Sequence, residues 1–244
     1  IKKLENNMTN PTYININRIL GVMTFLVSFI VYFDTMAPSV SYWDCGEFIA
    51  VSYTLGVPHP PGSPLFLLLG RIASMLPISD DIAFRVNLLS PLASSFAVLF
   101  LYFTIVQLVK HWRGKIETKT DALIAFGAGL VGALTFAFTD SHWFNAVEAE
   151  VYAFSTFFTA IVVWLALLWS EKADEEGHER YILIIAYMIG LATGLHLLNL
   201  LTIPFVALLI YFRKFKFKWS SFGILVALTG LVFFIIHNVI IKGM

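Results

Sequence analysis

The stretch Ser63-Pro-Leu-Phe-Leu-Leu-Leu-Gly-Arg-Ile-Ala-Ser-Met-Leu-Pro77 decides how this chain is arranged. It is apolar, but it is short, contains Arg71 and is bracketed by prolines. A helix needs about 20 apolar residues to cross a bilayer, and shorter stretches are more typical of interfacial or re-entrant segments. We therefore predict that 63–77 lies at the membrane surface and does not span it.

The sequence on either side of this stretch indicates an integral membrane protein. Hydrophobic residues make up 58% of the chain and charged residues 13%, whereas an average soluble domain has about 25% charged residues. Seven runs are apolar enough to be membrane spans. They lie at about 16–35, 84–109, 121–139, 150–170, 180–197, 199–212 and 219–240. We predict an all-α polytopic bundle with about seven transmembrane helices and interfacial helices in a long first outer loop.

The distribution of lysine and arginine tests this topology, because short cytoplasmic loops are enriched in both. If 63–77 does not span, 13 of the 16 basic residues fall on one side. These are Lys2, Lys3, Arg18, Lys110, Arg113, Lys115, Lys119, Lys172, Arg180, Arg213, Lys214, Lys216 and Lys218. If it does span, the clusters at 110–119 and 213–218 move outside, against the rule. We therefore place the N-terminus in the cytoplasm, and the loop 34–83 outside with tight turns near 140–149 and 197–199.

The outer side collects carboxylates. Ser41-Tyr-Trp-Asp-Cys-Gly-Glu-Phe48 follows the first span and places Asp44 and Glu47 three residues apart. If Trp43–Leu55 is helical, both carboxylates lie on one face; the plainer interpretation is a helix start, where acidic residues suit the helix dipole. Ionisable groups beside a bilayer usually mark a working site, which favours a functional role here. The aromatic residues expected to anchor this helix at the membrane are Tyr42, Trp43 and Phe48.

A second outer motif surrounds His59. The run Gly56-Val-Pro-His-Pro-Pro-Gly-Ser-Pro64 is rich in residues that fix the backbone or need unusual dihedral angles. Such a turn can hold an imidazole in one orientation, or it can simply be a proline-rich entry to the next helix.

A third outer motif is Thr139-Asp-Ser-His-Trp-Phe-Asn-Ala-Val-Glu-Ala-Glu-Val-Tyr152. Glu148 and Tyr152 are one helical turn apart, whereas Glu148 and Glu150 are expected to point in different directions. We expect one of the two glutamates to face a cavity and the other to pair locally.

Two further histidines, His142 and His196, also fall on the outer side, where a lone histidine is often only a packing residue. No spacing of the His-Glu-x-x-His type is present, and there is no phosphate-binding loop, nucleophile elbow or dinucleotide fingerprint. We assign no metal ligands, although a divalent ion bound by carboxylates from separate loops stays open as an alternative. The zero formal net charge gives no indication of a nucleic-acid partner.

Together, Trp43-Asp-Cys-Gly-Glu-Phe48, Leu55-Gly-Val-Pro-His-Pro-Pro-Gly-Ser-Pro-Leu65 and Ala146-Val-Glu-Ala-Glu-Val-Tyr152 resemble a bacterial membrane family long catalogued as a domain of unknown function. Its eukaryotic relatives act as protein O-mannosyltransferases, and both resemble the GT-C glycosyltransferases. The resemblance covers about Tyr32 to Pro204. It implies an inverting enzyme that takes a sugar from polyprenyl phosphate at the outer, periplasmic face of a bacterial inner membrane.

The resemblance also implies roles for individual residues. Asp44 matches the position of the catalytic carboxylate, with Glu47 as the second choice. The leaving phosphate needs a cation, for which Arg85 is better placed than Arg71, a residue we interpret as a membrane anchor. The remaining residues expected to bind substrate are His59, Glu148, Glu150, Tyr152, His142 and His196.

The partners expected are a polyprenyl-phosphate sugar and a secreted or membrane protein acceptor. We expect 1–244 to be a GT-C-like transmembrane domain from the N-terminal part of a longer protein. Two other classes stay open: a non-catalytic membrane subunit of a larger assembly, and a transporter of a lipid-linked substrate. A transporter would place carboxylates near the membrane midplane.

Overall fold

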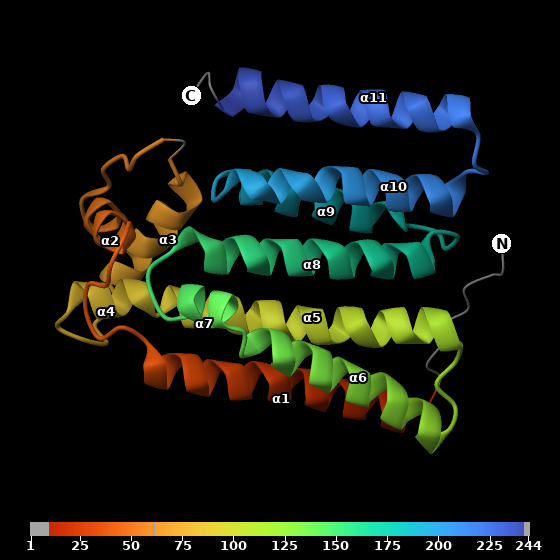
Figure 1. The fold of residues 1–244 in the computed structure, drawn as a ribbon, viewed down its shortest axis with the longest axis horizontal. Helices are drawn as coiled ribbons and strands as arrows, with labels where there is room; N and C mark the ends of the chain where they lie inside the picture. Colours follow the sequence, from red (N-terminus) through yellow and green to blue (C-terminus); the bar gives the residue numbers. More distant parts are fainter. Residues whose placement is uncertain (1–9, 61, 242–244) are drawn as a thin grey trace.

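The computed structural model describes residues 10–60 and 62–241, and all regular secondary structure in these ranges is helical (Figure 1). The helices are α1 Pro11–Thr35, α2 Cys45–Thr54, α3 Pro64–Ser74, α4 Ile82–Asn87, α5 Leu89–Arg113, α6 Lys119–Ala137, α7 Asp140–Ala146, α8 Val151–Lys172, α9 Glu179–Thr193, η1 Leu197–Leu201, α10 Thr202–Lys214, α11 Trp219–Ile235 and the π-helical η2 Ile236–Ile241.

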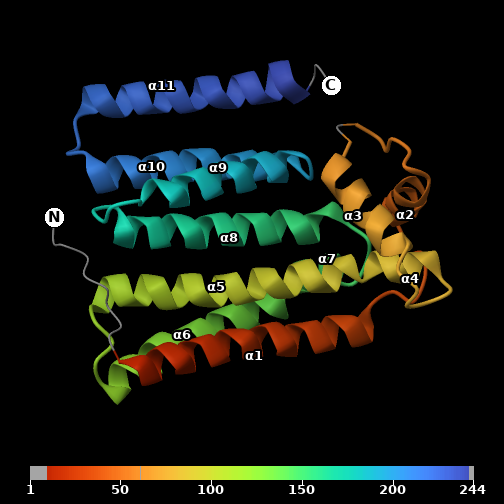
Figure 2. The ribbon, with the colours of Figure 1, turned by 180° about the vertical axis from the view of Figure 1, so that it is seen from behind.

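The long helices run side by side, and the short helices α2, α3, α4 and α7 gather at one end of them (Figures 1 and 2). Six helical stretches in the described residues are long and apolar enough to cross a membrane: Pro11–Thr35, Ile82–Arg113, Lys119–Ala137, Val151–Lys172, Leu197–Lys214 and Trp219–Val239. The predicted all-α polytopic membrane fold is confirmed.

The predicted span 180–197 corresponds to α9, which has only 15 residues. At 1.5 Å per residue it is about 22 Å long, less than the ~30 Å thickness of the hydrocarbon core. It packs against α8 and returns along the bundle. The stretch 63–77 forms α3, which has 11 residues and is too short to span, as predicted. The turn predicted near 140–149 is wrong in one respect, because α7 occupies Asp140–Ala146.

Helix α5 is the centre of the bundle, where it packs against α1, α6 and α8. Small buried residues such as Ala93, Ser94 and Ala97 let neighbouring backbones approach closely. Gly129 of α6 shows how tight this packing is, since a Cβ at that position would lie 2.8 Å from the ring of Tyr102. The close contact between α5 and α6 therefore depends on the absence of a side chain there.

Several basic residues used in the topology argument lie together at one end of the bundle. Lys110, Lys172, Arg213 and Lys214 lie at helix ends opposite to α2, α3 and α4 (Figure 1). We call this the basic end of the bundle, and the end formed by α2, α3, α4 and α7 the acidic end. Two basic residues used in the topology argument, Lys2 and Lys3, lie outside the described residues, as does Lys242 near the other end of the sequence.

Candidate active site

Asp44 stands at the start of α2, immediately after an unusual backbone turn. The preceding Trp43 has φ of +58°, in a left-handed region that bulky residues rarely adopt. Such conformations cost free energy and cluster at functional sites. The Asp44 side chain makes no capping hydrogen bond to α2 and is 57% exposed. Its carboxylate is therefore free to accept a proton or a ligand.

Glu47 holds His59 through two contacts. One oxygen, Oε1, accepts the backbone N–H of His59 at 2.7 Å, and Oε2 lies 2.7 Å from its ring Nδ1. The other ring nitrogen, Nε2, is 4.0 Å from Oδ2 of Asp44. The hydrogen bond with Glu47 raises the pKa of His59, and the same bond lowers the pKa of Glu47. The imidazole is thus held in one orientation and favoured in its charged form.

The turn that carries His59 is closed as the sequence predicts. Gly62 has φ of +76°, and its N–H donates to the carbonyl of His59 at 3.0 Å. Pro61, within the same motif, lies outside the described residues.

A buried acidic group lies behind Asp44. The Cys45 thiol donates to Oε1 of Glu150 at 3.7 Å, and the Ser41 hydroxyl donates to Oε2 of Glu148 at 2.5 Å. Glu148 and Glu150 therefore converge on Cys45, and the expectation that they point in different directions is wrong. The expectation assumed a helix, but Glu150 is extended (φ −129°, ψ 146°), and residues two apart in extended chain share a face. Burial, together with the nearby charge of Asp44, raises the pKa of Glu150 to about 7.

A small cavity of about 70 Å³ is lined by Asp44, His59 and Glu150 together with apolar and aromatic residues. Its lining residues come from α2, the His59 turn, the start of α8 and the turn before η1: Asp44, Phe48, His59, Ser63, Glu150, Val151, Tyr152, Leu195 and His196. The rings of Tyr152 and His196 are 5.0 Å apart. Glu150 of the third motif lines this cavity, whereas Glu148 accepts the hydrogen bond of Ser41, a residue distant in sequence. We call this cavity the acidic pocket.

Four of the predicted site residues do not line the acidic pocket. Glu47 and Glu148 adjoin residues that do, whereas Arg85 and His142 are held elsewhere. Arg85 donates from Nη1 to the carbonyls of Ser74 (2.5 Å) and Leu76 (3.2 Å), where α3 ends. His142 is buried with its ring 4.3 Å from that of Phe136, and burial lowers its pKa to about 4. Their predicted contacts with substrate find no support in this arrangement.

Arg71 also has a protein partner. Its Nη1 donates to the carbonyl of Tyr53 at 2.6 Å, and its guanidinium lies over the Tyr53 ring. This residue braces α3 against the end of α2 instead of acting only as a membrane anchor. Phe48 is not an anchor either, because it is 4% exposed and packs against Phe66.

Sequence reasoning missed Asn87, which ties the loops of the acidic end together. Its Nδ2 donates to the carbonyls of Ala37 and Ser39, each at 2.9 Å, and its Oδ1 accepts the N–H of Ala149 at 3.1 Å. The signal available in the sequence was an asparagine inside the predicted span 84–109, and the structure shows it fully buried. Ser63 was missed as well, and its hydroxyl donates to the carbonyl of Leu195 at 2.9 Å.

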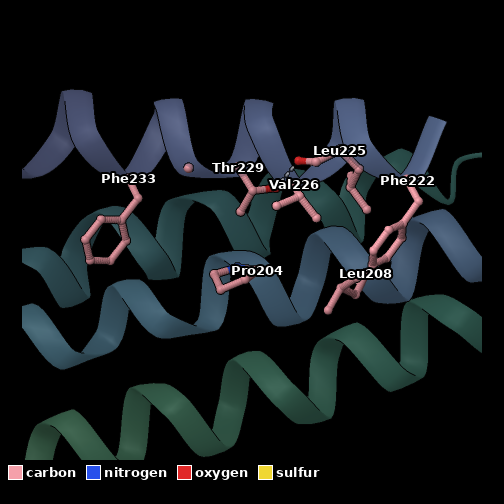
Figure 3. A pocket seen from close by; sticks show the side chains of 8 residues that line it. Pro204, Leu208, Phe222, Leu225, Val226, Thr229 and Phe233 are labelled. Atoms are coloured by element: carbon pink, nitrogen blue, oxygen red, sulfur yellow. Dashed lines mark hydrogen bonds between the residues drawn. The ribbon is translucent and has the colours of Figure 1, made fainter. Parts of the chain in front are cut away.

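Apolar cavities continue from the acidic pocket toward α11. One of about 360 Å³ is lined by η1, Phe233 and His237, and it shares His196 with the acidic pocket. A further groove of about 290 Å³ lies between α10 and α11 and shares Phe233 with it (Figure 3). Its walls are Pro204, Leu208, Phe222, Leu225, Val226, Thr229, Gly230 and Phe233. No ionisable side chain lines this groove, so it suits an apolar ligand and offers no group for acid–base chemistry.

The fold and the site define a multi-pass helical membrane protein with carboxylates and histidines gathered at one end of its bundle. The chain belongs to the family described as the protein O-mannosyl-transferase TMEM260 N-terminal domain, whose sequence profile matches residues 44–219. The matched region begins at Asp44 and includes every residue that lines the acidic pocket.

Two curated relatives illustrate the family. The chain is 32% identical over 228 residues to protein O-mannosyl-transferase tmem260 of Dictyostelium discoideum, covering 87% of this chain and 25% of that protein. It is 29% identical over 195 residues to protein O-mannosyl-transferase TMEM260 of Mus musculus, covering 80% of this chain and 26% of that protein. The chain thus spans about a quarter of the length of these relatives. No solved structure matches it.

Proposed function

We propose that this chain is the membrane domain of a GT-C-type glycosyltransferase that transfers a sugar, as in protein O-mannosylation, from polyprenyl phosphate to a protein hydroxyl. The observation that carries the proposal is the acidic pocket, in which Asp44, His59 and Glu150 meet in a chain of this family. The names of the two relatives state a protein O-mannosyl-transferase activity for those proteins.

Asp44 is the proposed general base. Its uncapped, half-exposed carboxylate takes the proton of the acceptor hydroxyl while that oxygen attacks the anomeric carbon. The bond between the anomeric carbon and the phosphate oxygen breaks, and the polyprenyl phosphate leaves with its charge. A nearby carboxylate also stabilises the oxocarbenium-like transition state. Direct attack inverts the configuration of the sugar.

His59 is the proposed cationic group of the pocket. The Glu47 hydrogen bond raises its pKa, so it can meet a phosphate or sugar oxygen as a charged donor. We favour His59 over Arg85 for this role, because the Arg85 guanidinium is already bound to backbone carbonyls. Glu47 then acts through His59 instead of serving as the base.

The apolar cavities along η1, α10 and α11 are proposed to hold the polyprenyl tail. They adjoin the acidic pocket through His196, and their walls match a hydrocarbon chain (Figure 3). The acidic end is proposed to face the periplasm of a bacterial inner membrane, with the basic end in the cytoplasm, in keeping with the distribution of lysine and arginine.

The test is a transfer assay in nanodiscs with polyprenyl-phosphate mannose and a Ser/Thr-rich secreted acceptor. Asp44→Asn should lower transfer by at least about 100-fold, because general base catalysis typically contributes 10²–10⁴-fold. The matched control is Asp34→Asn, which changes a carboxylate on the same side of the membrane that does not line the pocket. Full activity in Asp44→Asn would move the base to Glu150, and no transfer by the wild type with any donor would favour a non-catalytic subunit.

A further inference from the structure

The acidic end contains two groups of side chains with the composition of metal ligands, and they differ in how their charges are satisfied. The first, Asp44, Glu47 and His59, is exposed and internally paired through the two contacts between Glu47 and His59. The second, Cys45, Glu148 and Glu150, consists of buried residues. Only the second group leaves buried charge without a partner.

The degree of burial is what makes the second group unusual. Cys45 is 0% exposed, Glu148 3% and Glu150 6%. Oε1 of Glu148 is completely enclosed and accepts no hydrogen bond. In the described part of the chain, Glu148 and Glu150 form no ion pair with lysine or arginine. Enclosing two neighbouring carboxylates without a cation costs several kcal/mol per charge, so the group needs protons or a metal ion.

The donor atoms are arranged for a metal ion. Their ligand atoms all lie within 4.8 Å of one another. The Cys45 sulfur and Oε1 of Glu150 are 3.7 Å apart, close to the ~3.5 Å between two ligands on a tetrahedral Zn²⁺ with bonds of about 2.0–2.3 Å. Ser41 donates to Oε2 of Glu148 and orients that carboxylate, as residues around metal ligands commonly do.

We propose that Cys45, Glu148 and Glu150 form a binding site for a divalent transition-metal ion, Zn²⁺ by the chemistry of its ligands. A thiolate together with carboxylates suits Zn²⁺ and disfavours Mg²⁺ and Ca²⁺, which prefer oxygen ligands alone. On binding, the thiol proton and any proton held by Glu150 pass to solvent. The two positive charges of the ion offset two of the three negative charges of the thiolate and the two carboxylates. This inference stands independently of the proposed enzymatic activity.

The experiment is a titration of chelator-treated protein in detergent with Co²⁺, which reports thiolate ligation through an ultraviolet charge-transfer band. Cys45 is the only cysteine of the chain, so any such band comes from this site. We expect one equivalent of Co²⁺ to give the band, Zn²⁺ to displace it and Mg²⁺ to leave it unchanged. Cys45→Ser should abolish the band, and Glu150→Gln should weaken Co²⁺ binding at least 10-fold.

Glu47→Gln is the matched control, since it removes a carboxylate from the exposed group and should leave the titration unchanged. Zn²⁺ should also raise the thermal midpoint of the wild type, which is a readout that does not depend on any variant folding. The proposal is overturned if the wild type shows neither a band nor stabilisation by Zn²⁺. It is equally overturned if Glu47→Gln abolishes binding while Glu150→Gln does not.

Discussion

The carboxylates at the two ends of the bundle differ in whether a basic side chain pairs with them. At the basic end, Glu171, whose side chain is 11% exposed, lies between Lys110 (3.4 Å) and His111 (3.3 Å), and Asp174 pairs with Arg213 at 2.6 Å. At the acidic end, Glu148 and Glu150 are buried without such partners. Ion pairs that join helix ends serve the fold, whereas buried carboxylates kept without cations cost stability and indicate a site for a ligand.

The largest effect expected from this comparison is at Glu171. Glu171→Gln leaves the Lys110 ammonium, whose side chain is only 11% exposed, without its carboxylate. Breaking a buried pair from one side typically costs about 3–5 kcal/mol, so the free energy of unfolding should fall by about 3–4 kcal/mol. Glu150→Gln should cost less than about 1 kcal/mol or be stabilising, because it removes an uncompensated charge.

Both variants should be measured by reversible unfolding in mixed micelles with a chelator present, so that metal binding does not contribute. The comparison between the two ends would be broken if Glu150→Gln were as destabilising as Glu171→Gln. That result would mean that Glu150 has a structural partner in solution.

The next effect concerns acid stability. Burial lowers the pKa of His142 to about 4, below the ordinary value near 6.5 that applies to the unfolded chain. The stabilisation from a neutral His142 is therefore present above pH 6.5 and is lost as the pH falls toward 4, amounting to about 3 kcal/mol over this range. His142→Phe should remove this part of the loss.

The measurement is the thermal midpoint between pH 7.5 and 4 for the wild type and His142→Phe. Carboxylates titrate in both proteins, so the difference between the two curves isolates His142. Parallel curves would show that His142 is not buried in its neutral form.

A smaller effect is expected at Asn87, which fastens the acidic end from within. Asn87→Ala removes three hydrogen bonds to backbone groups, two in the loop between α1 and α2 and one in the loop between α7 and α8. Each contributes about 0.5–1.5 kcal/mol net. The free energy of unfolding should fall by about 2 kcal/mol, and Co²⁺ binding should weaken because Ala149 lies between two proposed ligands. Asn87→Asp keeps one acceptor and loses both donor bonds, which makes it the matched variant. Wild-type metal affinity in Asn87→Ala would show that the loops hold their own positions.

Much of this architecture could be predicted because membrane crossing has a simple physical requirement. Length and apolarity alone place the bundle and exclude α3 as a span. The acidic pocket is harder to predict from the sequence. Asp44, Glu47 and His59 stand out as motif residues, but nothing local shows that Glu148 and Glu150 converge on Cys45, because that depends on extended backbone before α8. The role of Asn87 depends on contacts about 50 and 62 residues away, which no local pattern reveals.

The smallest expected effect is on the pKa of His59, and it compares its two carboxylate neighbours at the acidic end, Glu47 and Asp44. Glu47→Gln removes the carboxylate that raises the pKa of His59, so that pKa should fall. Because the pKa of His59 in the folded protein is raised, its stabilising contribution is present below pH 6.5 and lost as the pH rises through the folded value. The titration can be followed by NMR of labelled histidine, with His59→Gln to assign the signal.

Asp44→Asn is the matched comparison. Its carboxylate is 4.0 Å from Nε2, against 2.7 Å between Glu47 and Nδ1, so the fall should be smaller. A larger fall in Asp44→Asn would make Asp44 the true partner of the imidazole and leave Glu47 free to serve as the base.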